Sequence, residues 1–281
     1  KYMEIVSPLS PGDFPPDSIS LDDNPLAYKT IASSSPDTSL SKTNLRLSPS
    51  YNTTIEKLTT IESPLYTAVL SSRGGGTIKS FHIKDYYTAD SQMVNVLMGL
   101  DGLNLLTKVN NIDGQPLNLS LPWRQVSEFS EAGPNKTETL TYSFEFSPGK
   151  YIRRVLTFYH GSYIIDLDVR CDDGRGLLSG DLEIGWYGGL ASTENNHKDD
   201  HVYFKSYVLQ GGEIENLKIK TGEAESRLFN GSADWGAIRT KYFVSALIPR
   251  DLSSVRRASL TAQYDSLETY NVSFFVDITN V

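Results

Sequence analysis

The chain has 281 residues, 39% of them hydrophobic, and its 26 Lys and Arg against 34 Asp and Glu give a net charge of -8. This length is sufficient for one large all-β domain or two domains of ordinary size. The acidic balance, with no basic cluster longer than a pair, argues against nucleic acid and against an anionic membrane surface as partners, because both need concentrated positive charge.

Residues 1 to 54 are rich in Ser, Pro, Asp and Thr. Such a composition buries too little apolar surface to offset the entropy of ordering the backbone. We therefore predict an extended, linker-like segment over 1–54. Across the whole chain no apolar run approaches the ~20 residues that span a bilayer, no signal peptide is visible, and the single Cys171 leaves no intramolecular disulfide.

Residues 55 to 281 carry short β-rich runs separated by glycine and asparagine turns, and no helical period longer than two turns. This pattern predicts an all-β domain over 55–281. In Tyr163 to Val169 apolar and acidic residues alternate, which indicates a half-buried strand. In chain order, the expected strands are Thr54 to Glu62, Leu65 to Ser72, Thr77 to Ile83, Glu138 to Phe146, Tyr151 to Tyr159, Tyr163 to Arg170, Asp181 to Trp186, Val202 to Tyr207, Glu215 to Lys220, Trp235 to Ile238, Tyr242 to Ile248, Ser259 to Tyr264 and Tyr270 to Ile278.

Two segments have a residue order more specific than their composition. The first runs from Glu62 to Phe81 and contains Ser-Arg-Gly-Gly-Gly, in which Gly74 to Gly76 are expected to take positive φ angles at a tight turn. The second runs from Trp235 to Pro249 and is interrupted by a polar break at Arg239 to Lys241. It predicts two short buried strands joined by a turn, although the three- and four-residue spacing of its apolar positions also permits a helix.

Together these segments resemble the periplasmic domain of the bacterial membrane protein insertases of the YidC/Oxa1/Alb3 class. The Arg-Gly-Gly hairpin resembles the opening of that domain, and the Trp-Gly, Lys-Tyr-Phe and Leu-Ile-Pro stretch resembles its late aromatic block. The resemblance covers roughly residues 55 to 281, with the middle matched by pattern alone. Its diagnostic residues, all expected to be structural, are Arg73, Gly74, Gly75, Trp235, Gly236, Tyr242, Phe243 and Pro249.

The resemblance implies a β-supersandwich of two large antiparallel sheets, similar to galactose mutarotases. It also implies a non-catalytic docking or scaffold domain on the periplasmic side of the bacterial inner membrane, with translocon components and nascent membrane proteins as partners. In that family the membrane is reached through transmembrane helices outside this domain. No cofactor and no catalytic residue is expected. The alternatives are a carbohydrate-binding or aldose-epimerase-like protein on the same fold and a surface or secreted adhesion module.

Three patterns could carry chemistry. His197 and His201 lie four apart with two carboxylates between them, a metal spacing only if the segment is helical, and a solvated loop is favoured. Asp166, Asp168, Asp172 and Asp173 could offer oxygen ligands to calcium, but are expected to be the wet face of a strand and a turn. Trp186 and Tyr187, followed by two glycines, could floor a groove, although a core position for Trp186 is preferred.

Overall fold

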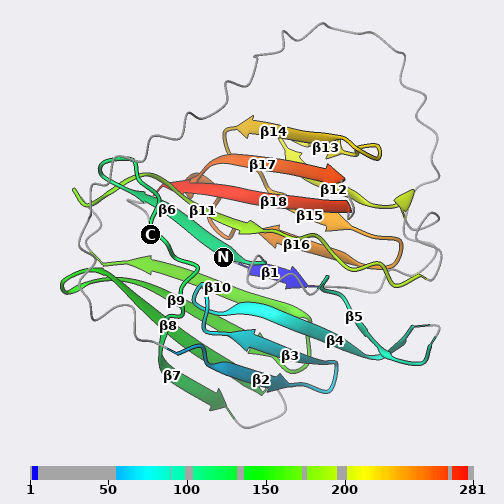
Figure 1. Ribbon diagram of the computed structural model, residues 1–281, viewed down its shortest axis with the longest axis horizontal. Helices are drawn as coiled ribbons and strands as arrows, with labels where there is room; N and C mark the ends of the chain where they lie inside the picture. Colours follow the sequence, from blue (N-terminus) through cyan, green and yellow to red (C-terminus); the bar gives the residue numbers. More distant parts are fainter. Residues whose placement is uncertain are drawn as a thin grey trace, which may run out of the picture.

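The computed structural model describes residues 2–5, 55–88, 90–98, 104–131, 136–172, 176–194, 201–264 and 268–277 (Figure 1). Apart from one 3-10 helix, η2 at Leu252–Ser254, and the helical residue His201, the regular elements in these residues are all strands. The predicted all-β class is therefore confirmed. The predicted boundary at residue 54 stays a prediction, since of residues 1–54 the structure describes only 2–5.

The largest sheet has nine antiparallel strands in the order β13-β12-β15-β16-β1-β10-β9-β8-β7. Its two ends come from distant parts of the chain. The strands are β1 (Tyr2–Ile5), β7 (Arg124–Glu131), β8 (Thr137–Ser147), β9 (Lys150–Tyr159), β10 (Ile164–Cys171), β12 (Lys205–Gln210), β13 (Glu213–Leu217), β15 (Trp235–Arg239) and β16 (Val244–Ile248).

Two smaller sheets complete the fold. The five-stranded sheet has the order β14-β17-β18-β11-β6 and the four-stranded sheet the order β2-β3-β4-β5. The hydrogen bonds thus define three sheets where two were expected, because β6 pairs with β11 and not with β5. Their strands are β2 (Leu58–Glu62), β3 (Tyr66–Ser71), β4 (Thr77–Tyr87), β5 (Met93–Asn95), β6 (Leu106–Asn111), β11 (Leu178–Trp186), β14 (Ala224–Asn230), β17 (Val255–Tyr264) and β18 (Glu268–Asp277).

Each smaller sheet packs against one half of the large sheet. Gly76 directly precedes β4, the second strand of the β3-β4 hairpin. A Cβ on Gly76 would meet Leu156 of β9 and Tyr142 of β8. A Cβ on Gly236 of β15 would meet Val272 of β18. The alternating burial of β9 and β17 places one apolar face of each strand in this shared core.

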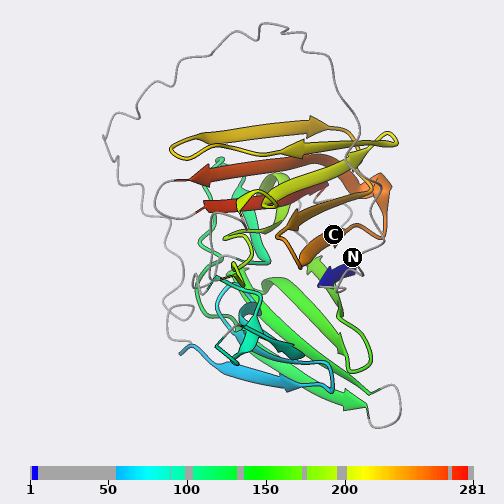
Figure 2. The ribbon, with the colours of Figure 1, turned by 90° about the vertical axis from the view of Figure 1, so that its right-hand side faces the viewer.

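The four-residue strand β1 joins the two halves of the large sheet. It pairs antiparallel with β10 on one side and with β16 on the other. Figure 1 shows β1 between β16 and β10 near the centre of the molecule, and Figure 2 shows the same arrangement from the side. Without it, β13-β12-β15-β16 and β10-β9-β8-β7 share no ladder.

Every expected strand overlaps an observed one, and the miss at β14 has a clear physical cause. The sequence pattern overlooked β1, β5, β6, β7 and β14, and it placed β12 three residues early. In β14 nearly all residues are exposed and the strand lies at a sheet edge. A strand that buries neither face carries no hydrophobic alternation to detect.

Candidate functional site

The Arg-Gly-Gly hairpin is a close contact between backbone and core. Gly74, Gly75 and Gly76 have φ angles of 62°, 71° and 97°, which confirms the predicted positive φ values. A Cβ on Gly75 would lie 2.6 Å from Cε3 of Trp123 and 3.0 Å from Cδ of Arg154. Glycine is thus required for two reasons: the backbone has a positive φ, and there is no room for a Cβ.

Arg154 is the buried group that this hairpin covers. Its guanidinium donates hydrogen bonds to the carbonyl oxygens of Gly74 and of Leu105, the second at 2.7 Å. Complete burial lowers the pKa of Arg154 to about 9, so the group still carries its charge at neutral pH. Arg73 itself points outward and pairs with Glu56 at 3.0 Å. The motif therefore builds structure and presents no reactive group.

The late aromatic block is the predicted strand pair. Strands β15 and β16 are joined by a tight turn in which the Thr240 amide donates to the Phe243 carbonyl at 2.8 Å. Phe243 and Pro249 are buried, Trp235 is half-buried and Tyr242 is exposed. Gly236 lies under β18, where any side chain would overlap Val272.

Trp186 is the last residue of β11, and Tyr187, which follows it, lies in a different environment. Trp186 is fully buried and its indole Nε1 donates to the Gly189 carbonyl at 2.9 Å. The ring of Tyr187 folds back over Gly185, its hydroxyl donates to Glu183, and Lys108 Nζ lies 3.6 Å from the ring centroid. Burial, assisted by Glu183, raises the pKa of Tyr187. Only Tyr187 of the two has surface to offer a partner.

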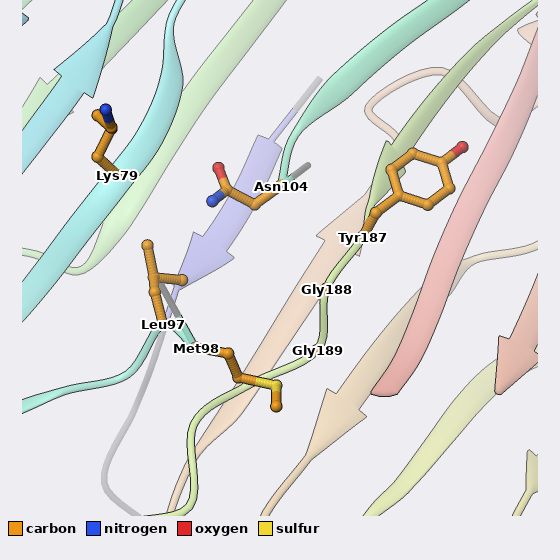
Figure 3. A pocket seen from close by; sticks show the side chains of 7 residues that line it. All are labelled: Lys79, Leu97, Met98, Asn104, Tyr187, Gly188 and Gly189. Carbon is orange, nitrogen blue, oxygen red and sulfur yellow. The ribbon is translucent and has the colours of Figure 1, made fainter. Parts of the chain in front are cut away.

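A small pocket lies beside Tyr187, Gly188 and Gly189, which follow β11. Figure 3 shows Asn104 between Lys79 and Tyr187, with the Tyr187 hydroxyl pointing away from the other lining side chains. The cavity volume is about 10 Å³, which is room for about one water molecule. The Asn104 amide already accepts from the Ile78 N–H at 2.7 Å. The lining residues are Lys79, Leu97, Met98, Asn104, Tyr187, Gly188 and Gly189.

Two of the three histidines in the described residues contact carboxylates. His160 contacts Glu138 at 2.8 Å, and His201 contacts Glu268, which also accepts from the Tyr270 hydroxyl at 2.8 Å. His197 lies outside the described residues, so its spacing to His201 is not tested. Among the residues whose placement is described, no three His, Cys, Asp or Glu side chains converge on a common point.

The three described residues of the acidic set pair with three different arginines. Asp166 was expected on a wet strand face, but its side chain is only 15% exposed. It accepts from the Tyr159 hydroxyl at 2.6 Å and pairs with Arg250. Asp168 is 49% exposed and pairs with Arg170. Asp172 pairs with Arg153, while Asp173 lies outside the described residues.

Exposed aromatic and apolar side chains gather where the end of β4 meets the β15-β16 turn. Tyr87 is 63% exposed and Tyr242 is 45% exposed. The two segments touch through Tyr86 and Phe243, whose ring centroids are 6.2 Å apart in an edge-to-face arrangement. We call Tyr86, Tyr87, Met93 and Tyr242 the aromatic rim. Tyrosine is enriched at protein interfaces because its ring buries much apolar area while its hydroxyl stays wet.

Sequence reasoning found Tyr242 as a marker but missed the other rim residues. A signal exists in Tyr86-Tyr87, which ends a strand before Thr88, Asp90 and Ser91. Alternation along a strand would leave one of the two tyrosines exposed, and the irregular end of β4 exposes both.

Comparison with known proteins gives a consistent result. The family model of the YidC periplasmic domain matches residues 58–281. The chain is 30% identical over 203 residues to the membrane protein insertase YidC of Chlorobium limicola, covering 70% of this chain and 35% of that protein. It is 32% identical over 205 residues to the YidC insertase of Prosthecochloris aestuarii, covering 69% and 34%.

The chain thus spans about a third of the length of the curated relatives that it matches. Among the described residues, no helix has the length and apolar character needed to cross a bilayer.

Proposed function

Since the chain belongs to the YidC periplasmic domain family, we propose that it serves a membrane protein insertase as a non-catalytic accessory domain on the periplasmic side of the inner membrane. The match over 58–281 carries this proposal. The proposed task is docking: the domain holds translocon components or emerging membrane proteins near the membrane-embedded part of the whole protein.

The proposed architecture is a β-supersandwich. The nine-stranded sheet forms one layer, and the four- and five-stranded sheets together form the other. Face-to-face packing at Gly76 and at Gly236 supports this arrangement. The two smaller sheets would then act as one layer without a continuous ladder.

The aromatic rim is the proposed docking surface. Its side chains are exposed, and they stand on the end of β4, on the start of β5 and on a turn in which both the backbone and the side chain of Thr240 hydrogen-bond to Phe243. A rigid scaffold that presents exposed tyrosines loses little conformational entropy on binding. The surface is therefore suited to repeated, moderate-affinity contacts with protein partners.

Site-specific photo-crosslinking in the whole insertase tests this surface. A crosslinking amino acid at Tyr87 or Tyr242 is expected to capture membrane protein partners, whereas one at Leu228, which is 52% exposed on β14, serves as the matched control. Equal capture at all three positions would mean that the rim is not a docking surface.

Deletion of residues 60–275 from the whole protein tests the accessory role. Insertion of substrates is expected to continue at a reduced level, because the membrane-embedded portion is proposed to carry the activity. If insertion stops while the remaining protein is stable in the membrane, the domain is essential and the accessory role is wrong.

The carbohydrate alternative has less support. A sugar epimerase needs a general acid and a general base facing each other across a cleft, but the pocket beside Tyr187 holds about one water. A titration with monosaccharides, followed by tryptophan fluorescence, should give no saturable change. A saturable signal would favour this alternative.

A further inference from the structure

The gap that β1 fills in the large sheet has two open strand edges. The far edges of β10 and β16 are already paired with β9 and β15. Among the described residues their facing edges pair with β1 alone, which runs antiparallel to both. Because β10 and β16 consequently run parallel to each other, a segment antiparallel to both can satisfy the two edges at once.

The register defines the chemistry that this gap accepts. We number the positions in the gap by the β1 residues that fill them. Position 3, that of Met3, lies between Ile165 of β10 and Leu247 of β16, and both of those side chains are buried. Position 4 lies between Ile164 and Ala246, which are half-buried. A well-matched occupant is therefore an extended peptide with an apolar residue at every second position.

An ion pair crosses the gap at one end. Position 2 pairs with Asp166 on one side and with Ile248 on the other. Arg250, two residues beyond Ile248, reaches over to Asp166 at 2.5 Å. This pair ties β10 to the end of β16 independently of the β1 ladder, so the two edges are expected to stay near each other when β1 leaves.

From this geometry we propose that β10 and β16 form a strand-acceptor site, in which the chain's own Tyr2–Ile5 is an exchangeable occupant. The family match begins at residue 58, so both edges belong to the family domain and the occupant does not. Ile5 and Leu58 are 53 positions apart, and the four-residue ladder of β1 is short for a central strand. An extended peptide of matching pattern can thus take the place of residues 2–5 by β-strand addition. The inference stands on the pairing register and not on the proposed docking function.

A peptide-binding experiment tests the site directly. The probe is a fluorescein-labelled peptide with the sequence of residues 1–8, titrated by anisotropy against the chain lacking residues 1–6 and against the intact chain. We expect saturable binding to the shortened chain and at least ten-fold weaker binding to the intact chain, whose site is filled. A peptide with proline at positions 3 and 4 is the control, since it lacks one backbone donor toward each neighbouring strand.

The proposal fails if the shortened chain is folded, has the thermal midpoint of the intact chain, and binds no peptide. Should the shortened chain not fold, cysteine crosslinking of the intact chain provides the second test, in a Cys171→Ser background. Glu4→Cys with Ala246→Cys is expected to form an intramolecular disulfide, whereas Glu4→Cys with Thr157→Cys is not. A disulfide found only between two copies would overturn occupancy by the chain's own segment, and no disulfide would overturn the site.

Discussion

The hairpin that covers Arg154 and the junction of β10, β1 and β16, which we call the seam, both hold the large sheet in place. They do so by opposite means. At the hairpin, Gly74 to Gly76 lie against the buried Trp123, Arg154 and Tyr142, with no room for a side chain. At the seam, four residues from a distant part of the sequence supply a backbone ladder. Contacts of the first kind specify one packing arrangement, whereas a ladder can be formed by any extended segment of suitable pattern.

This difference separates what identifies the family from what interacts. The Arg-Gly-Gly motif is diagnostic because its backbone position permits only glycine. The strand edges at β1 and the aromatic rim impose weaker demands on sequence. We therefore expect substitutions at the hairpin to act on stability, and changes at the seam or the rim to act mainly on binding.

The largest effect is expected for Gly75→Ala. The new Cβ would overlap Trp123 and would require φ near 71°, so the free energy of unfolding should fall by about 3 to 5 kcal/mol. Gly149→Ala is the matched control, because Gly149 has the same φ of 71° and no atom within 4 Å of the added Cβ. It should cost about 1 kcal/mol. Urea titrations of both variants measure the difference, and equal losses would show that packing contributes nothing.

Gly236→Ala tests a second close contact of the kind seen at the hairpin, in the other half of the large sheet. Its Cβ would overlap Val272 across the two sheets, and the expected loss of stability is about 2 kcal/mol. Gly161→Ala, where nothing lies within 4 Å of the added Cβ, should change the thermal midpoint little. A Gly236→Ala midpoint equal to that of Gly161→Ala would refute the close approach of β15 and β18.

Proline in β1 tests the seam. In Met3→Pro/Glu4→Pro one lost N–H faces β10 and the other faces β16, because successive backbone groups of a strand point to opposite sides. The expected loss is about 1 to 2 kcal/mol by urea unfolding, limited because the strand can detach without disturbing the remaining fold. Met3→Ala/Glu4→Ala keeps both donors and should cost less. Equal costs for the two variants would argue that the ladder is not what holds β1.

The smallest effect concerns the ion pair across the seam. Asp166→Asn weakens the contacts with Tyr159 and Arg250 and should cost about 1 kcal/mol, since Arg250 is partly exposed to solvent. Asp168 lies two residues further along β10 and forms an exposed ion pair with Arg170. Asp168→Asn should change the free energy of unfolding by less than about 0.5 kcal/mol. The pair has no role in closing the seam if both variants unfold at the same urea concentration.

The sequence was sufficient for the all-β class and for strands that bury one face, such as β9 and β10, because their apolar positions alternate. It was not sufficient for β14, which buries almost nothing, or for β1, whose four residues precede a long polar segment. Strand pairing between residues 2–5 and two strands more than 150 positions away leaves no local signal. The aromatic rim likewise depends on Tyr86 meeting Phe243, a contact set by the fold.

Amide hydrogen exchange, compared between the intact chain and the chain lacking residues 1–6, tests the contrast between the two regions most directly. We predict that removal of residues 1–6 speeds exchange in β10 and β16 at amides facing the seam, including among Ile164–Leu167 and Ser245–Ile248, by at least about ten-fold. Amides of β4 and β9 around Ile78 and Leu156 should be unaffected. Unchanged protection at the seam, or equal acceleration throughout the sheet, would contradict an exchangeable strand beside a fixed hairpin.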